Sequence, residues 1–262
     1  MILKRPSEID AMEDAAVINR AALEAVEAMI APGVTTLELN DVAEEVIVRN
    51  GGRPAFKGYR GFPATLCTSL NEVVVHGIPD GRPLEEGDIV SVDVGTFYKG
   101  YAADMAKTYA VGTIPEEVQR LLDTTERSLY AGVDQAQAGN RLGDVSAAIQ
   151  DVIEREGMWV VREFVGHGIG RTFHEPPDVP NYGRAGAGPL LRPGLVLAIE
   201  PMVAMSRTSI IVLDDGWTAP TETGVLSAHF EHTVAITDDG PRILTAKETM
   251  TKRSQEGRQH GA

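Results

Sequence analysis

The stretch LEEGDIVSVD, residues Leu84–Asp93, recurs 107 residues later as LRPGLVLAIE, residues Leu191–Glu200. In each copy a polar turn leads into an apolar run that ends on a carboxylate, which is typical of a buried strand carrying one acid. A buried carboxylate is unfavourable unless it is neutralised, hydrogen-bonded or bound to a metal ion. The repeated stretch therefore predicts a duplicated unit whose copies bring Asp93 and Glu200 to face each other.

Amphipathic helices are predicted in both halves of the chain. Apolar residues spaced three and four apart indicate helices at residues 7–31, 35–51, 115–138 and 142–155. Ser7 with Asp10 is the expected start signal of the first helix, and the capping box Thr35-x-x-Glu38 opens the second. Chance similarity between amphipathic segments is an alternative for the helices, but it accounts less well for the matching acidic strands.

The predicted fold class is α+β, with two pseudo-symmetric halves that each contain two helices followed by antiparallel strands. The halves are expected at about residues 7–112 and 113–245, within a single domain at residues 1–250. The polar residues 251–262 lack periodicity, and a frayed tail is expected there. The Gly- and Pro-rich residues 175–189 predict a long loop near the site or a flap.

Three more side chains extend the acidic pair into a ligand set. Asp104 follows Asp93 by eleven residues, a spacing that suits two antiparallel strands joined by a turn. Glu231 occupies the position matching Asp104 in the second half, and His167 adds an imidazole. Carboxylates with one imidazole and no thiol are ligands for a hard or borderline divalent ion. Surface salt bridges are the alternative, but they do not explain why the acids recur within apolar strands.

The other histidines allow two interpretations. His76 follows the apolar run VVV, and His174 lies in GHGIGRTFHEPP. Each is either an ordinary hydrogen-bonded core histidine or a donor to a tetrahedral oxyanion. His229 and His232 flank the last acid, and we predict structural roles for both, with His232 orienting its neighbours.

Composition excludes several classes of protein. Of the 262 residues 43% are hydrophobic and 24% charged, which is ordinary for a soluble globular protein. No apolar run approaches the ~20 residues of a membrane span. The single cysteine, Cys67, excludes an internal disulfide and favours a reducing cytoplasm. The net charge of −14 argues against a nucleic-acid binder and favours cationic partners such as a peptide amine.

Six motifs together resemble those of the methionine aminopeptidases. They are NEVVVHGIPD, GDIVSVDVG, GYAADMAKTY, GHGIGRTFHEPP, LAIEPM and FEHTVAIT, and the resemblance runs from about residue 5 to about residue 245. It implies the pita-bread fold around a central dimetal site. Only 31 positions separate Glu200 from Glu231, which leaves no room for the helical insert of the type II branch. The resemblance is therefore to the bacterial type I enzymes.

This resemblance implies a role for each ligand. Asp93 would bind one divalent cation, His167 and Glu200 the other, and Asp104 and Glu231 would bridge both. A metal-bridging water or hydroxide would attack the carbonyl of the first residue, with Glu200 as the general base. The sequence does not distinguish Co, Mn, Fe and Zn, since the same ligands accept each.

The resemblance also implies a substrate pocket. Its residues would be Phe56, Tyr59, Phe62, Cys67, Phe173 and Trp217. Aromatic rings and a sulfur are suitable surroundings for a methionine side chain, although core packing is the ordinary explanation for any one of them. His174 would stabilise the tetrahedral intermediate, and His76 would contact the amide on the leaving side. Phe56 and Phe62 replace residues that are often Cys and Tyr in related enzymes.

The implied substrates are the N-termini of nascent polypeptides with a small second residue. Transient ribosome association is compatible with this function, and a cytoplasmic monomer without nucleic-acid or membrane partners is expected. Two rival hypotheses are a prolidase-like or Xaa-Pro aminopeptidase and a non-catalytic binding protein on the same scaffold. Prolidases usually carry a large extra N-terminal domain, and non-catalytic relatives lose ligands, whereas here all five are present.

Overall fold

The computed structural model describes residues 1–246, so the tail expected at residues 251–262 lies outside the described residues. The four α-helices of this part are α1 (Pro6–Glu27), α2 (Thr36–Arg49), α3 (Glu116–Gln135) and α4 (Leu142–Arg155). All four predicted helices are present. None of the helices in this part of the chain has the length and apolar character that a membrane span needs.

Antiparallel strands follow each pair of helices. The first set consists of β1 (Arg53–Pro54), β2 (Leu66–Leu70), β3 (Val73–Val75), β4 (Ile89–Tyr98) and β5 (Tyr101–Ala110), with a 3₁₀ turn at Tyr59–Gly61. The second set consists of β6 (Trp159–Val160), β7 (Gly166–Gly168), β8 (Glu175–Val179), β9 (Val196–Ile199), β10 (Met202–Ala204), β11 (Ala219–Pro220), β12 (Ser227–His229), β13 (His232–Thr237) and β14 (Gly240–Ile243). The α+β organisation predicted from the sequence is confirmed.

Some local expectations differ from the structure. Helix α1 begins at Pro6 with Arg5 as N-cap, and the Glu8 side chain accepts from the Arg5 backbone N–H, so Ser7 with Asp10 was the wrong start signal. The Thr35–Glu38 capping box of α2 is confirmed. Residues 175–179 of the predicted loop form β8, because they pair with β7 at the edge of a five-stranded sheet.

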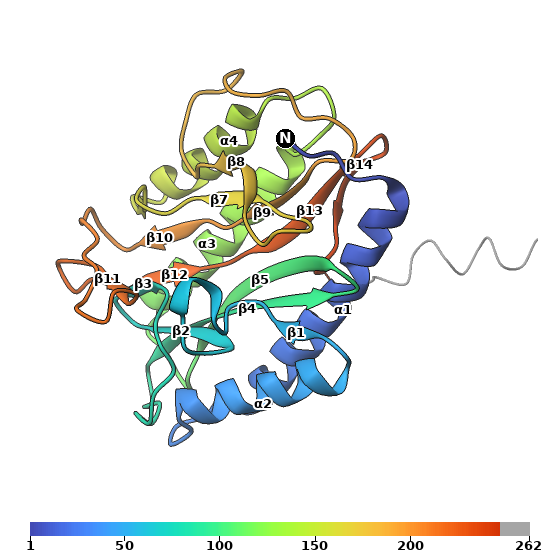
Figure 1. The fold of residues 1–262 in the computed structure, drawn as a ribbon. Helices are drawn as coiled ribbons and strands as arrows, with labels where there is room; N and C mark the ends of the chain where they lie inside the picture. The colour runs from blue at the N-terminus through green and yellow to red at the C-terminus, as the bar shows by residue number, and fades with distance from the viewer. Residues whose placement is uncertain (247–262) are drawn as a thin grey trace, which may run out of the picture.

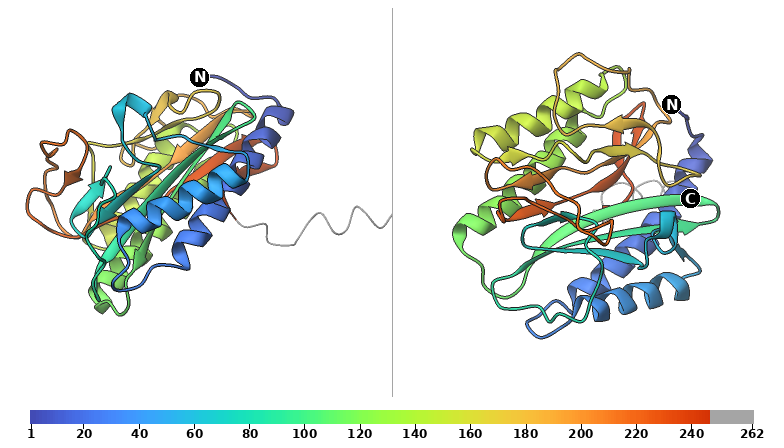
Figure 2. Two further views of the ribbon diagram at one scale, coloured as in Figure 1. Left: turned by 60° about the horizontal axis from the view of Figure 1, so that its bottom comes forward. Right: turned by 60° about the vertical axis from the view of Figure 1, so that its left-hand side comes forward.

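The two helix pairs each cover the strands of their own half (Figures 1 and 2). Helices α1 and α2 contact each other and pack on β1, β2, β4 and β5, whereas α3 and α4 pack on β6, β9, β10 and β12. Separate apolar clusters fill these two interfaces, and a third lies between the halves and includes Phe56, Phe62 and Phe173. The helices thus hold the strands from outside, and the inner faces remain for the site.

Polar contacts join the strands of the two halves along β5. The Glu231 backbone N–H donates to the Ala106 carbonyl at 2.9 Å. The Thr233 hydroxyl accepts from the Asp104 backbone N–H at 2.9 Å and donates to the Asp104 carbonyl at 2.7 Å. Thr108 makes the same pair of contacts with the backbone of His229, each at 2.9 Å. These bonds set the relative position of the strands that carry the acids.

A buried ion pair fixes the N-terminal arm against the second half. Lys4 Nζ lies 2.6 Å from Glu175 Oε2, and the two side chains are 4% and 3% exposed. The other oxygen of Glu175 accepts the backbone N–H of Arg171 at 3.0 Å. Gly170 leaves the room for this contact, since a Cβ there would lie 2.4 Å from Lys4 Cε. The pair therefore anchors the segment that leads to His174.

Removing one partner of this pair should destabilise the fold strongly. Lys4→Met leaves the Glu175 carboxylate buried without its cation, and the free energy of unfolding should fall by about 3–5 kcal/mol. The matched control is Lys57→Met, which breaks the Lys57–Glu44 pair at 2.7 Å with side chains 51% and 32% exposed. That change should cost less than about 1 kcal/mol. Urea unfolding measures both, and equal losses would contradict the interpretation.

Candidate metal centre

The strand registers place all five predicted ligands on inward faces. In the first sheet Asp93 pairs with Ala106 and Gly95 pairs with Asp104, so the two aspartates are diagonal neighbours on one face. In the second sheet His167 pairs with Ala198, and Thr233 pairs with the same residue from the other side. Glu200 and Glu231 lie two residues from that row and share its face.

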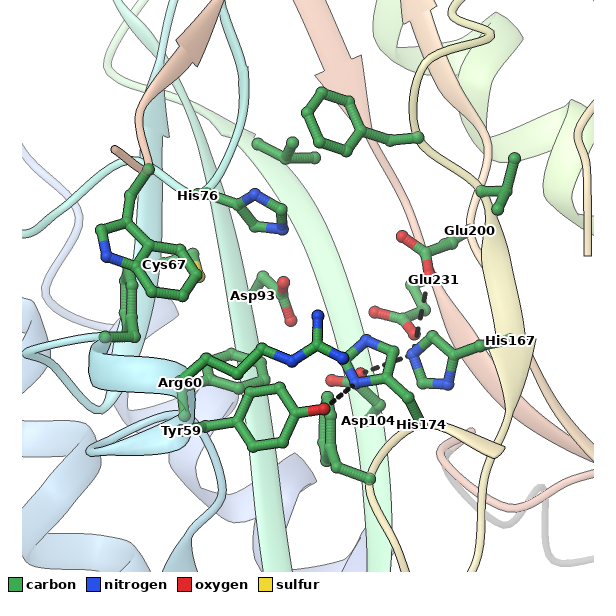
Figure 3. A pocket seen from close by; sticks show the side chains of 17 residues that line it. Tyr59, Arg60, Cys67, His76, Asp93, Asp104, His167, His174, Glu200 and Glu231 are labelled. Atoms are coloured by element: carbon green, nitrogen blue, oxygen red, sulfur yellow. Dashed lines mark hydrogen bonds and ion pairs between the residues drawn. The ribbon is translucent and has the colours of Figure 1, made fainter. Parts of the chain in front are cut away.

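The five ligand side chains turn toward a shared space between the sheets (Figure 3). One donor atom each from Asp104, His167 and Glu231 lie within 4.8 Å of one another. His167 Nε2 is 3.7 Å from Asp104 Oδ2 and 3.8 Å from Glu200 Oε1. These separations are too long for hydrogen bonds and leave a space between the donors that a cation can occupy.

The backbone around His167 determines which nitrogen faces the acids. His167 Nδ1 lies 2.9 Å from the Gly168 carbonyl, so Nδ1 carries the proton and donates it there. The lone pair of Nε2 then points toward the carboxylates, as a metal ligand requires. Glycines flank this histidine because β7 runs between two other backbones. A Cβ on Gly166 would lie 2.3 Å from the Ala198 carbonyl oxygen.

The carboxylates lack the partners that buried acids need. Asp93 Oδ1, Asp104 Oδ1 and Glu231 Oε1 are buried without any hydrogen-bond partner. Burial, together with the charge of the neighbouring acids, raises the pKa of Asp93 and of Glu231 well above the ordinary range. Burial also raises the pKa of Asp104, although His167 opposes this. A divalent cation would remove both penalties, so the residues present fit a bound metal.

Two side chains lie around this cluster, of which His229 was expected to be structural and Asn181 was missed. His229 Nε2 lies 3.5 Å from Glu200 Oε2, and the Asn181 side chain donates to the Glu200 carbonyl at 3.0 Å. The ring of His232 contacts Thr245 at 2.8 Å and Tyr130 at 3.3 Å, so the neighbours that it can orient are these two residues. The alternation of side chains along a strand was the available signal. His229 is two residues from Glu231 and so lies on the same face, whereas His232 is adjacent to Glu231 and points to the other face.

A pocket lined by aromatic side chains leads to the acids. All six predicted pocket residues line it, and so do Arg60, Val75, Phe164 and Val165, which sequence reasoning missed. Phe56 packs edge-on against Phe173 with ring centroids 5.3 Å apart, and Phe62 packs against Trp217 at 5.1 Å. Gly95 permits this arrangement, because a Cβ there would lie 2.7 Å from the Phe173 ring. Arg60 could have been predicted to line the pocket only from its place in the sequence between Tyr59 and Phe62.

Cys67 lies at the inner wall of this pocket, opposite Asp93 in the β2–β4 register. Burial raises the pKa of the Cys67 thiol well above its ordinary value, and the nearby Asp93 carboxylate adds to this. The thiol is therefore protonated, and its sulfur serves as a small apolar surface rather than as a nucleophile.

Both remaining site histidines are held neutral. Burial lowers the pKa of His174 to about 4, and the adjacent His167 adds to this effect. The Tyr59 hydroxyl lies 2.9 Å from His174 Nδ1, and in the tautomer in which the hydroxyl donates to Nδ1, Nε2–H is a donor toward the pocket. Burial lowers the pKa of His76, whose ring stands edge-on to Phe164 at 5.2 Å. Neutral imidazoles can donate a hydrogen bond without adding a cation beside a metal.

Known proteins are similar to this chain in sequence and in fold. The model of metallopeptidase family M24 matches residues 10–238. A methionine aminopeptidase of Clostridium perfringens is 51% identical over 245 residues, which cover 94% of this chain and 98% of the relative. The crystal structure of methionine aminopeptidase from Thermotoga maritima matches with a TM-score of 0.93 and 45% identity, over 94% of this chain and all of that one. A Pyrococcus furiosus prolidase is 24% identical with a TM-score of 0.78, and its match covers 66% of the prolidase, so that likeness shows the fold alone.

The raised pKa of Glu231 predicts a pH-dependent penalty in metal-free protein. Because the folded state holds this proton more tightly than the unfolded chain, the contribution of Glu231 to stability is greatest below its ordinary pKa and is lost as pH rises toward the raised value. In chelator-treated protein, Glu231→Gln should therefore increase the free energy of unfolding more at pH 8 than at pH 5, by at least about 1 kcal/mol.

Thermal unfolding at the two pH values measures this difference. Repeating it with excess Mn²⁺ is the control, because the variant has then lost a ligand and should be less stable than the wild type. An effect of Glu231→Gln that is the same at both pH values without metal would contradict the interpretation of a repulsive buried acid.

Proposed function

The chain belongs to metallopeptidase family M24, among its methionine aminopeptidases, and we propose that it removes the N-terminal methionine of nascent proteins at a centre of two divalent cations. The predicted family and pita-bread fold are thereby confirmed. One observation carries the proposal. Buried acids, three of which have a carboxylate oxygen without a hydrogen-bond partner, lie at the inner end of a pocket whose walls are aromatic rings and a thiol. This arrangement suits a peptide amine next to an apolar thioether side chain.

The five clustered side chains would hold the cations. Asp93 would bind one ion, His167 and Glu200 the other, and Asp104 and Glu231 would bridge the two. Bound divalent ions would polarise the scissile carbonyl and lower the pKa of a water molecule. The donors accept Co, Mn, Fe or Zn, and cellular supply decides among them. Because ligands come from both halves, we propose that residues 1–250 act as one catalytic domain, with halves at about 7–112 and 113–245.

The side chains around the cluster would perform the proton transfers. Glu200 would take the proton of the attacking water as general base, and His229, 3.5 Å from its Oε2, would keep it oriented. His174 would donate from Nε2 to the oxygen of the tetrahedral intermediate. His76, on the opposite wall, would contact the amide nitrogen that leaves. Phe56, Tyr59, Phe62, Cys67, Phe173 and Trp217 would surround the methionine side chain.

The expected substrates are free N-termini with a small second residue. We propose that the enzyme acts as a cytoplasmic monomer on chains emerging from the ribosome, to which it would bind only transiently. A prolidase-like activity has only distant likenesses in its support. A non-catalytic role would not require all five ligands and two neutral histidines at one pocket.

A peptide panel tests the function directly. Enzyme reconstituted with each metal in turn should release methionine from Met-Ala-Ser, act poorly on Met-Leu-Ser and leave Xaa-Pro dipeptides intact. Glu200→Gln is the control for contaminating peptidases, because it removes the base and should abolish turnover while the fold is retained. Preferential cleavage of Xaa-Pro dipeptides would overturn the proposal.

The role proposed for His174 predicts a loss in kcat. His174→Ala should reduce kcat by ~10²–10³, the scale of removing one oxyanion donor, with little change in KM. Because the pKa of His174 is lowered to about 4, the wild-type rate should show no loss from its titration between pH 6 and 8. Steady-state kinetics across this range check both points. A change confined to KM would contradict the assignment.

A further inference from the structure

Arg60 is a cation at the mouth of an otherwise acidic site. Its side chain is exposed and lines the same pocket as the five ligands, where it is the only arginine or lysine among residues 1–246. Within residues 1–246 no carboxylate forms an ion pair with it, although the chain carries a net charge of −14. Its guanidinium lies over the Tyr59 ring, 5.4 Å from the centroid. An arginine left without a carboxylate at a binding site is available to a ligand.

The turn that presents Arg60 is tightly specified. Gly58 and Gly61 have φ angles of 85° and 90°, and Arg60 itself has a φ of 50° inside the 3₁₀ turn. That left-handed conformation favours glycine or asparagine over a residue with a long side chain. Backbone preference therefore does not explain an arginine at this position. The turn holds the Arg60 side chain at the pocket mouth, beside Tyr59, whose hydroxyl is hydrogen-bonded to His174.

The bound peptide chain would run out of the site past Arg60, which rests on the proposed function. The peptide amine would lie at the acids and the methionine side chain among the aromatic rings. The rest of the peptide would then run outward past His174, toward which the Arg60 guanidinium reaches (Figure 3). Arg60 is close enough to lower the pKa of His174, after the larger effects of burial and His167. Residues just beyond the cleaved bond would thus come within its reach.

We propose that Arg60 is a specificity-determining residue that binds a carboxylate of the substrate in the third or fourth position. The second position must stay small, so a side-chain carboxylate can first be accommodated beyond it. A guanidinium and a carboxylate form bidentate, charge-assisted hydrogen bonds. Packing of the Arg60 guanidinium on the Tyr59 ring would keep its N–H groups oriented for such a pair. The contact would offset the repulsion that an acidic peptide meets from the net charge of −14 on this chain.

Matched peptides separate this contact from a general effect on the pocket. The substrates are amidated Met-Ala-Glu-Gly and Met-Ala-Gly-Glu, each with its Gln counterpart, assayed with metal-loaded enzyme. The wild type should favour one or both Glu peptides over their Gln counterparts by about five- to tenfold in kcat/KM at low salt. The preference should shrink toward unity in 0.5 M NaCl because the pair is exposed. Arg60→Gln should abolish it, Arg60→Lys should retain part of it, and Arg60→Glu should reverse it.

Arg53→Gln is the control. Arg53 is also exposed and lies 4.6 Å over an aromatic ring, that of Phe97, but it does not line the pocket. This variant should keep the wild-type preference. Equal kcat/KM for the Glu and Gln peptides in the wild type, or an unchanged ratio in Arg60→Gln, would overturn the assignment. Failure to cleave any Met-Ala peptide would instead overturn the proposed function, so the two failures are distinguishable.

Discussion

The acids gathered between two sheets impose the main constraint on this structure. Each carboxylate would be more stable in water, and each neighbouring acid raises the cost of ionising the next. The fold must therefore hold the two halves together against this repulsion. Apolar packing of two helix pairs supplies most of the stability, but it does not fix the separation of the acids. That task falls to the hydroxyls of Thr108 and Thr233, each of which binds both polar groups of one backbone residue.

The same constraint explains the state of the surrounding side chains. A fixed positive charge next to the carboxylates would weaken the binding of metal cations there. His76 and His174 are kept neutral by burial, and the Cys67 thiol is kept protonated, so none of them introduces a charge at neutral pH. In the described part of the chain, Arg60 is the one permanent cation that lines the pocket, and it lies at the exposed mouth. Charge is thus graded from acidic at the inner end to basic at the entrance.

The sequence allowed the fold and the acid cluster to be predicted for a physical reason. Acids at the ends of apolar strands and a helix capping box are local signals, and the acidic strands occur twice. Features that depend on distant contacts carry no such signal. From the sequence, Lys4 is expected at the surface, because its buried partner Glu175 is 171 positions away. His229 and Phe164 likewise gain their roles only from strands and loops that meet in the tertiary structure.

The repeat also shows how a symmetric scaffold yields an asymmetric site. The motif HGI occurs at residues 76–78 and again at 167–169, and in both copies the glycine lies against a neighbouring backbone. A Cβ would lie 2.2 Å from the Thr68 carbonyl oxygen at Gly77 and 2.8 Å from the Glu175 carbonyl oxygen at Gly168. The preceding histidines nevertheless differ. His167 is held in β7 with its ring toward the acids, whereas His76 has a φ of 61° that turns it to the aromatic wall. Both halves therefore supply acids, but only one supplies a clustered imidazole, which leaves the opposite wall open for a substrate.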